Sequence, residues 1–104
     1  MADGDDSATL LIEVTKDFGE TYAEVQAWAV PSSDRYPDGV KYSMQYGTTN
    51  GGTIIRYDNF PDHPGTTPHH KHLPNGETTD IEFTGLEALY DRFRQEVRDH
   101  GEHW

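Results

Sequence analysis

Apolar and polar residues alternate along the first sixty positions with the two-residue period of β-strands. The clearest case is the run from Lys41 to Gly47, which places Tyr42, Met44 and Tyr46 at every second position. Because successive side chains of a strand point to opposite faces, this run predicts a strand with one buried face and one polar face. Three other runs have the composition of strands: Thr9 to Thr15, Tyr22 to Val30 and Thr53 to Phe60.

Turn residues separate these runs. Gly19 lies between the first two, residues 31–39 have the composition of a loop, and Asn50-Gly51 lies between the last two. Asn-Gly is a strong signal for a two-residue hairpin turn. The strand from Thr53 is therefore expected to pair antiparallel with the strand from Lys41. A further short strand is expected around Thr79 to Phe83.

The last third of the chain changes to a helical period. Its apolar residues recur three or four positions apart: Leu86, Leu89, Tyr90, Phe93 and Val97. Thr84 and Glu87 have the spacing of a capping box, so a helix is predicted from there to about Asp99. The fold class is α+β, an antiparallel sheet of four to five strands with the C-terminal helix packed on one face. Residues 1–7 are expected to be a disordered N-terminal end, and residues 8–104 a single domain.

Charge and cysteine content exclude several kinds of function. The chain has 19 acidic and 8 basic residues, a formal net charge of −11, and no cysteine. The charge rules out a strong basic footprint for nucleic acid and resembles that of proteins from halophiles that accumulate salt. The absence of cysteine excludes disulfides and thiolate chemistry. No apolar run is long enough to cross a membrane and no signal peptide is evident, so a cytoplasmic protein without membrane contact is expected.

The segment from Pro61 to Glu77 concentrates the chemistry. It is expected to be one long loop, and loops of this length in compact domains are usually functional or disordered. Four of the six histidines of the chain lie in it: His63, His69, His70 and His72. The strand before it presents Arg56 and Asp58 on one face if Ile55 and Tyr57 point to the core. A simple surface ion pair is the alternative for Arg56 and Asp58.

Two histidines and a cation suffice for RNA cleavage without metal. One imidazole takes the proton of the ribose 2′-OH, a second donates to the leaving 5′-oxygen, and Arg56 stabilises the phosphoryl charge. His70 and His72 are the first candidates, because alternation points both to one side and Lys71 to the other. Two alternatives remain open: a solvated loop without chemistry, and a cupin-like metal site in which His70, His72 and Glu77 bind Zn²⁺, Mn²⁺ or Fe²⁺.

The stretch from Tyr42 to His72 resembles the TumE family of small prokaryotic toxins. The resemblance is carried by Arg56-Tyr57-Asp58-Asn59, then His63-Pro64, then the run from Pro68 to His72. Family members often carry His-His-Pro where this chain has Asp62-His63-Pro64. The resemblance implies a toxin that is neutralised by a cognate protein antitoxin encoded beside it.

Resemblance and histidine chemistry together predict a small metal-independent ribonuclease with an RNA substrate, no cofactor and possible homo-oligomerisation. The predicted catalytic residues are Arg56, His63, His69, His70 and His72. The predicted substrate-binding residues are Tyr57, Asp58 and Lys71, and stacking on Tyr57 and Phe60 is expected to help bind RNA at high salt. The alternative function is a non-enzymatic module that binds metal or titrates a protein partner.

Overall fold

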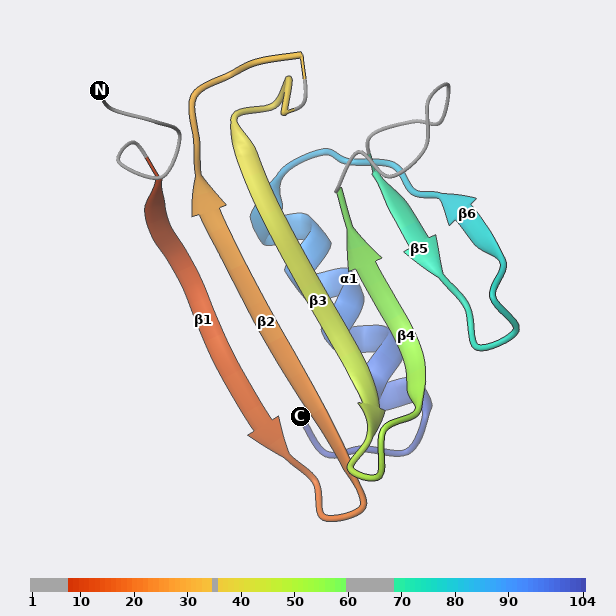
Figure 1. Cartoon of the computed structure of the whole chain (residues 1–104). Coiled ribbons are helices and arrows are strands. Elements are labelled where there is room, and N and C mark those ends of the chain that lie inside the picture. The colour runs from red at the N-terminus through yellow and green to blue at the C-terminus, as the bar shows by residue number, and fades with distance from the viewer. Residues whose placement is uncertain (1–7, 35, 60–68) are drawn as a thin grey trace.

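The structure is a computed structural model that describes residues 8–34, 36–59 and 69–104. The predicted disordered end at 1–7, His63 and Phe60 lie outside these residues. Six strands and one helix follow in order (Figure 1): β1 (Thr9–Asp17), β2 (Thr21–Ala29), β3 (Val40–Thr48), β4 (Thr53–Asp58), β5 (His70–His72), β6 (Thr78–Asp80) and α1 (Leu86–Asp99).

The strands form one antiparallel sheet in the order β1-β2-β3-β4-β5-β6. The predicted α+β class, the antiparallel sheet and the C-terminal helix are confirmed, whereas four to five strands is wrong. The additional strand is β5, which lies inside the predicted loop. A three-residue segment rich in histidine has no strand signature of its own, and its conformation comes from pairing with β4 and β6.

The turns form where the glycines predicted them. Gly19 and Gly51 both have positive φ, at 105° and 110°, which a residue with a side chain rarely adopts. The predicted capping box is wrong. Gly85 is the N-cap of α1, with a positive φ of 138° and without a side-chain cap. Thr84 therefore lies one residue before the cap, where its hydroxyl cannot complete the motif.

Helix α1 lies behind the sheet in Figure 1 and covers one of its two faces. We call the face toward α1 the helix face. The sheet contributes buried apolar residues to this interface, which include Val25, Tyr42, Met44, Tyr46, Ile55 and Tyr57. Helix α1 contributes Leu89, Phe93 and Val97. We call the opposite one the open face, because no helix or strand of the described residues packs on it. The alternation predicted for Tyr42, Met44 and Tyr46 is confirmed by their burial.

Candidate functional site

The candidate site lies on the open face where β4 and β5 run side by side. The register places Arg56 opposite His72 and Asp58 opposite His70. Directly opposite residues of an antiparallel pair have their side chains on the same face, about 5 Å apart. Pairing alone therefore brings two histidines, separated by twelve or more residues from β4 in the chain, onto Asp58 and Arg56.

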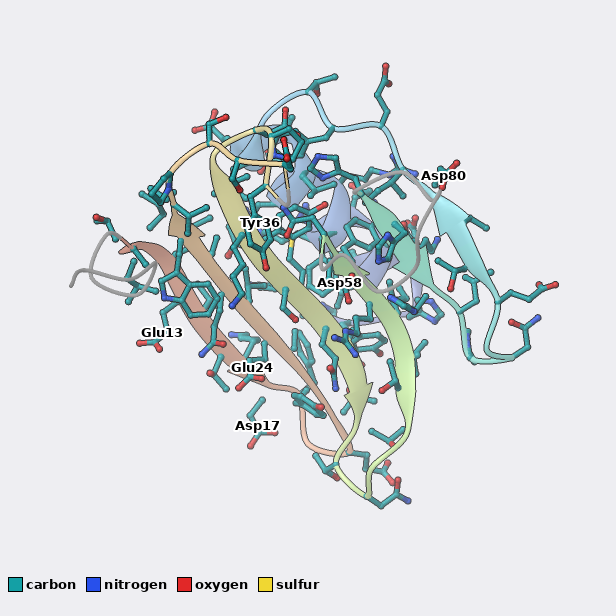
Figure 2. All side chains as sticks on the ribbon, turned by 45° about the horizontal axis from the view of Figure 1, so that its top comes forward. Glu13, Asp17, Glu24, Tyr36, Asp58 and Asp80 are labelled. Carbon is teal, nitrogen blue, oxygen red and sulfur yellow. The ribbon has the colours of Figure 1, made fainter. Side chains whose placement is uncertain are left out.

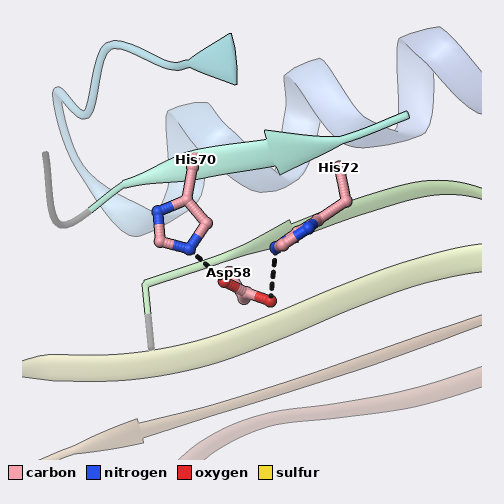
Figure 3. Close-up of side chains that lie close together, drawn as sticks. All are labelled: Asp58, His70 and His72. Atoms are coloured by element: carbon pink, nitrogen blue, oxygen red, sulfur yellow. Dashed lines mark ion pairs between the residues drawn. The ribbon is translucent and has the colours of Figure 1, made fainter. Parts of the chain in front are cut away.

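Asp58 lies at the centre of this group. Its Oδ1 is 2.9 Å from Nε2 of His70, and its Oδ2 is 3.3 Å from Nε2 of His72. Figure 3 marks both ion pairs with dashed lines. Nε of Arg56 lies 2.9 Å from Oδ2 of the same carboxylate. The two imidazole rings meet nearly edge to face with centroids 5.2 Å apart. One carboxylate thus contacts three groups that carry or can carry positive charge. We call Arg56, Asp58, His70 and His72 the Asp58 cluster.

Burial makes the cluster more than a surface ion pair. The Asp58 side chain has no exposed surface and that of His70 only 3%, whereas Arg56 is 35% exposed and His72 28%. A buried carboxylate is tolerated only when nearby groups compensate its charge. The cluster therefore has a closed inner side at Asp58 and His70 and an accessible outer side at Arg56 and His72.

The end of β4 is held firmly beside the cluster. Asn59 follows Asp58 and is buried. Its Oδ1 accepts the backbone N–H of Tyr42 at 3.0 Å, and its Nδ2 donates to the carbonyl oxygen of Val40 at 2.7 Å. These two hydrogen bonds replace the strand pairing that ends at Asp58. The carboxylate is therefore carried by a fixed piece of backbone.

Tyr57 and Lys71 lie on the other side of the same two strands. Tyr57 packs edge to face on Phe93 and its hydroxyl donates to the Glu96 carboxylate of α1. Nζ of Lys71 lies 2.7 Å from the second Glu96 oxygen. Burial, followed by the contact with Glu96, raises the pKa of Tyr57. Both residues thus face α1 and are separated from the Asp58 cluster by the backbone of the sheet.

His69 occupies a third environment. Its ring stacks on Phe83 at 4.3 Å between centroids and lies 2.8 Å from the Tyr42 hydroxyl through Nδ1 and 2.6 Å from Asp38 through Nε2. Burial, and secondarily the nearby charges of Asp58 and Asp38, raises the pKa of Tyr42. His69 therefore belongs to the packing at the edge of the helix face, although it precedes His70 directly.

One protein family matches nearly the whole chain. The family model described as Toxin TumE matches residues 2–100. The chain belongs to the TumE toxin family. No curated protein and no solved structure matches it. In the described residues of this TumE toxin, no helix is both long and apolar enough to cross a membrane.

Of the site residues predicted from the sequence, the structure of the TumE toxin brings four together and separates three. Arg56, Asp58, His70 and His72 form the Asp58 cluster, whereas Tyr57, Lys71 and His69 lie elsewhere as described. Sequence reasoning placed Asp58 beside Arg56 but missed its contacts with both histidines. The signal was the two-residue spacing of His70 and His72, which matches that of Arg56 and Asp58 once β5 is recognised as a strand.

Three members of the cluster could also hold a metal ion. The ligand atoms of Asp58, His70 and His72 all lie within 4.8 Å of one another. Two histidines and one carboxylate form a donor set suited to Fe²⁺, Zn²⁺ or Mn²⁺. Asp58 already contacts both rings at ion-pair distances of 2.9 and 3.3 Å. Glu77, the ligand expected from the sequence, is exposed and accepts a hydrogen bond from Asn75.

Proposed function

We propose that this TumE toxin acts as an endoribonuclease whose catalytic groups are His70, His72 and Arg56, positioned by Asp58. The observation that carries the proposal is the contact of one buried carboxylate with two imidazoles and a guanidinium. This arrangement brings a candidate base, a candidate acid and a cation within 3.3 Å of one carboxylate.

The reaction requires only proton transfer and displacement at phosphorus. One neutral imidazole takes the proton of the ribose 2′-OH, and the 2′-oxygen forms a bond to the adjacent phosphorus. The bond from phosphorus to the 5′-oxygen breaks, and the second, protonated imidazole gives its proton to that oxygen. The products are a 2′,3′-cyclic phosphate and a 5′-hydroxyl. Arg56 stabilises the negative charge that grows on the phosphoryl oxygens.

The geometry of the two rings suits a pair of proton-transfer groups. The imidazoles of His70 and His72 lie with centroids 5.2 Å apart, and both contact Asp58. Two rings this close can reach the 2′-oxygen and the 5′-oxygen of one phosphodiester, which the reaction requires of its base and its acid.

The experiment is induced expression of the wild type and of variants at the cluster, followed by sequencing of RNA ends. The wild type should arrest growth and create new ends with cyclic phosphate. His70→Gln and Arg56→Ala should each relieve toxicity while the far-UV circular dichroism spectrum is kept. His103→Ala is the matched control, because this exposed histidine lies beyond α1. Growth arrest with intact RNA, or full toxicity of both folded cluster variants, would contradict the proposal.

The second candidate is a metal-dependent toxin, and the donor set of Asp58, His70 and His72 favours it. Elemental analysis of purified protein discriminates between the two. About one Zn, Mn or Fe per chain, lost in His70→Gln and required for activity after EDTA treatment, would replace the metal-independent mechanism. Retention of that metal by Glu77→Gln would show that Glu77 is not a required ligand. Asp58 would then be the carboxylate of the donor set.

We further propose a protein antitoxin as the partner of this toxin. Family membership supports this pairing, and the genomic neighbourhood tests it. A small open reading frame next to the toxin gene should suppress the growth arrest when co-expressed, and its product should co-purify with the toxin. Absence of any such neighbour would favour a toxin that acts without a paired antitoxin.

A further inference from the structure

The open face extends from the Asp58 cluster across β3 to β2. Side chains that share this face form rows across the strands, because partners in the register lie opposite each other. Asp58 is opposite Ser43, and Ser43 is opposite Gln26. The next row along β2 and β3 pairs Trp28 with Lys41. A path of uncharged polar side chains thus leads from the cluster to Trp28 and Lys41.

Trp28 and Lys41 together offer an aromatic ring and a positive charge, which suit the base and the phosphate of a nucleotide. Both are partly exposed, and Nζ of Lys41 lies 5.9 Å from the centroid of the Trp28 ring. An indole ring on a sheet surface can stack on a base, and an ammonium group beside it can contact a phosphate. Trp28 is not among the residues that pack on the apolar core of the helix face, and it shares the open face with Lys41.

We propose that this TumE toxin binds single-stranded RNA across the open face, with one base stacked on Trp28 and a phosphate beside Lys41. The inference rests on the proposed ribonuclease function and assigns it a second substrate contact. Strand spacing and residue rise place Trp28 about 12 Å from Asp58 along the sheet. A strand of a few nucleotides spans this distance.

The charges of the rest of the open face fit one strand on this path. Glu13, Asp17 and Glu24 are exposed on β1 and β2 (Figure 2) and would repel phosphate on that side. Lys41 and Arg56 are the cations of β3 and β4 on the open face. The formal net charge of −11 provides no general attraction for RNA, so stacking has to supply binding energy that basic proteins obtain from phosphates.

Binding can be measured separately from cleavage with a fluorescent ten-nucleotide RNA that carries 2′-O-methyl groups throughout. This probe has no free 2′-OH, so the proposed reaction cannot occur on it. Trp28→Ala should raise the dissociation constant about 5- to 100-fold, as expected for the loss of one base stack. Trp28→Phe should recover part of the lost affinity. Lys41→Gln should lower the slope of log Kd against log salt by about 0.7.

Matched controls lie on the same sheet. Tyr22 is an aromatic residue of the open face of β2, next to Glu24 and off the path, so Tyr22→Ala should leave the dissociation constant unchanged. Lys16→Gln makes the same charge change on β1 and should leave the salt slope unchanged. Failure of the wild type to bind the probe, or equal binding by wild type, Trp28→Ala and Lys41→Gln, overturns the inference.

The outcomes also separate this inference from the proposed function. If the probe binds in a Trp28-dependent way and unmodified RNA stays intact, the binding face stands and the ribonuclease proposal fails. If unmodified RNA is cut and Trp28→Ala changes neither the dissociation constant nor KM, the ribonuclease proposal stands and the binding face is wrong. The circular dichroism spectrum of each variant confirms that it is folded.

Discussion

The two faces of the sheet are formed by the same strands but carry different kinds of side chain. The helix face carries apolar and aromatic side chains that pack on Leu89, Phe93 and Val97 of α1. The open face carries polar side chains, and its one fully buried charge, among the described residues, is Asp58. Residues adjacent in sequence thus have different roles: Tyr57 packs on the helix, whereas Arg56 and Asp58 on either side of it form the candidate site.

This difference shows how a small acidic chain can hold a precise polar cluster. Packing on the helix face fixes the backbone of β4 and β5, and the period of two then fixes the side chains on the opposite face. Changes on each face should accordingly affect different measured quantities, stability on one and toxicity on the other.

The largest expected difference is between two neighbours on β5. His72→Ala should reduce RNA cleavage about 10²- to 10⁴-fold, the usual contribution of a general acid or base. Lys71→Ala should leave cleavage within a few fold, because this side chain faces Glu96 on the helix face. Counting new RNA ends per unit of folded protein compares the two. Equal losses in both variants would show that the faces are not functionally separate.

The next effect concerns stability. Phe93 has no exposed surface and contacts the rings of Tyr57 and Trp104. Phe93→Ala should lower the free energy of unfolding by about 3–5 kcal/mol. Trp28→Ala, which removes a partly exposed aromatic residue from the open face, should cost much less. Urea denaturation followed by circular dichroism measures both, and a larger cost for Trp28→Ala would contradict the assignment of the core to the helix face.

A smaller effect is expected at His69, the direct neighbour of His70. His69→Phe keeps a ring stacked on Phe83 and removes the partner of the Tyr42 hydroxyl. A buried hydroxyl without a partner costs about 1–3 kcal/mol, so the unfolding free energy should fall by that amount. Toxicity of the folded variant should be unchanged. Loss of toxicity without loss of stability would return His69 to the catalytic candidates of the sequence.

The smallest effect lies at the C-terminal end of the chain. Glu102 accepts hydrogen bonds from the hydroxyls of Thr21 and Tyr46, and these lower its carboxyl pKa. A pKa that is lower in the folded state gives stability above the ordinary carboxyl pKa, and this stability is lost as pH falls through the folded value. Glu102→Gln should lower the melting temperature at pH 7 by no more than about 4 °C, because solvent screens the contact. The difference from wild type should shrink toward pH 3, and a difference that stays constant over this range would argue against the carboxylate.

The sequence by itself determined most of the secondary structure. Alternation in β3, the turn at Asn50-Gly51 and the helical spacing of the last third are local signals, and each produced the expected element. It also identified Arg56, Asp58, His70 and His72 as candidates, because four of the six histidines are concentrated directly after the strand that carries Arg56 and Asp58. The halophile character suggested by the acidic composition stays a prediction.

Only the tertiary structure decided which of these candidates meet. His70-Lys71-His72 is too short for a local strand signal, so its conformation depends on β4, a segment twelve or more residues away in sequence. The register of that pairing selects Asp58 as the group between both histidines and directs Lys71 to Glu96. Local composition specifies which residues can form a strand, but a register is a relation between two segments, so it is the pairing of β4 with β5 that determines which side chains meet.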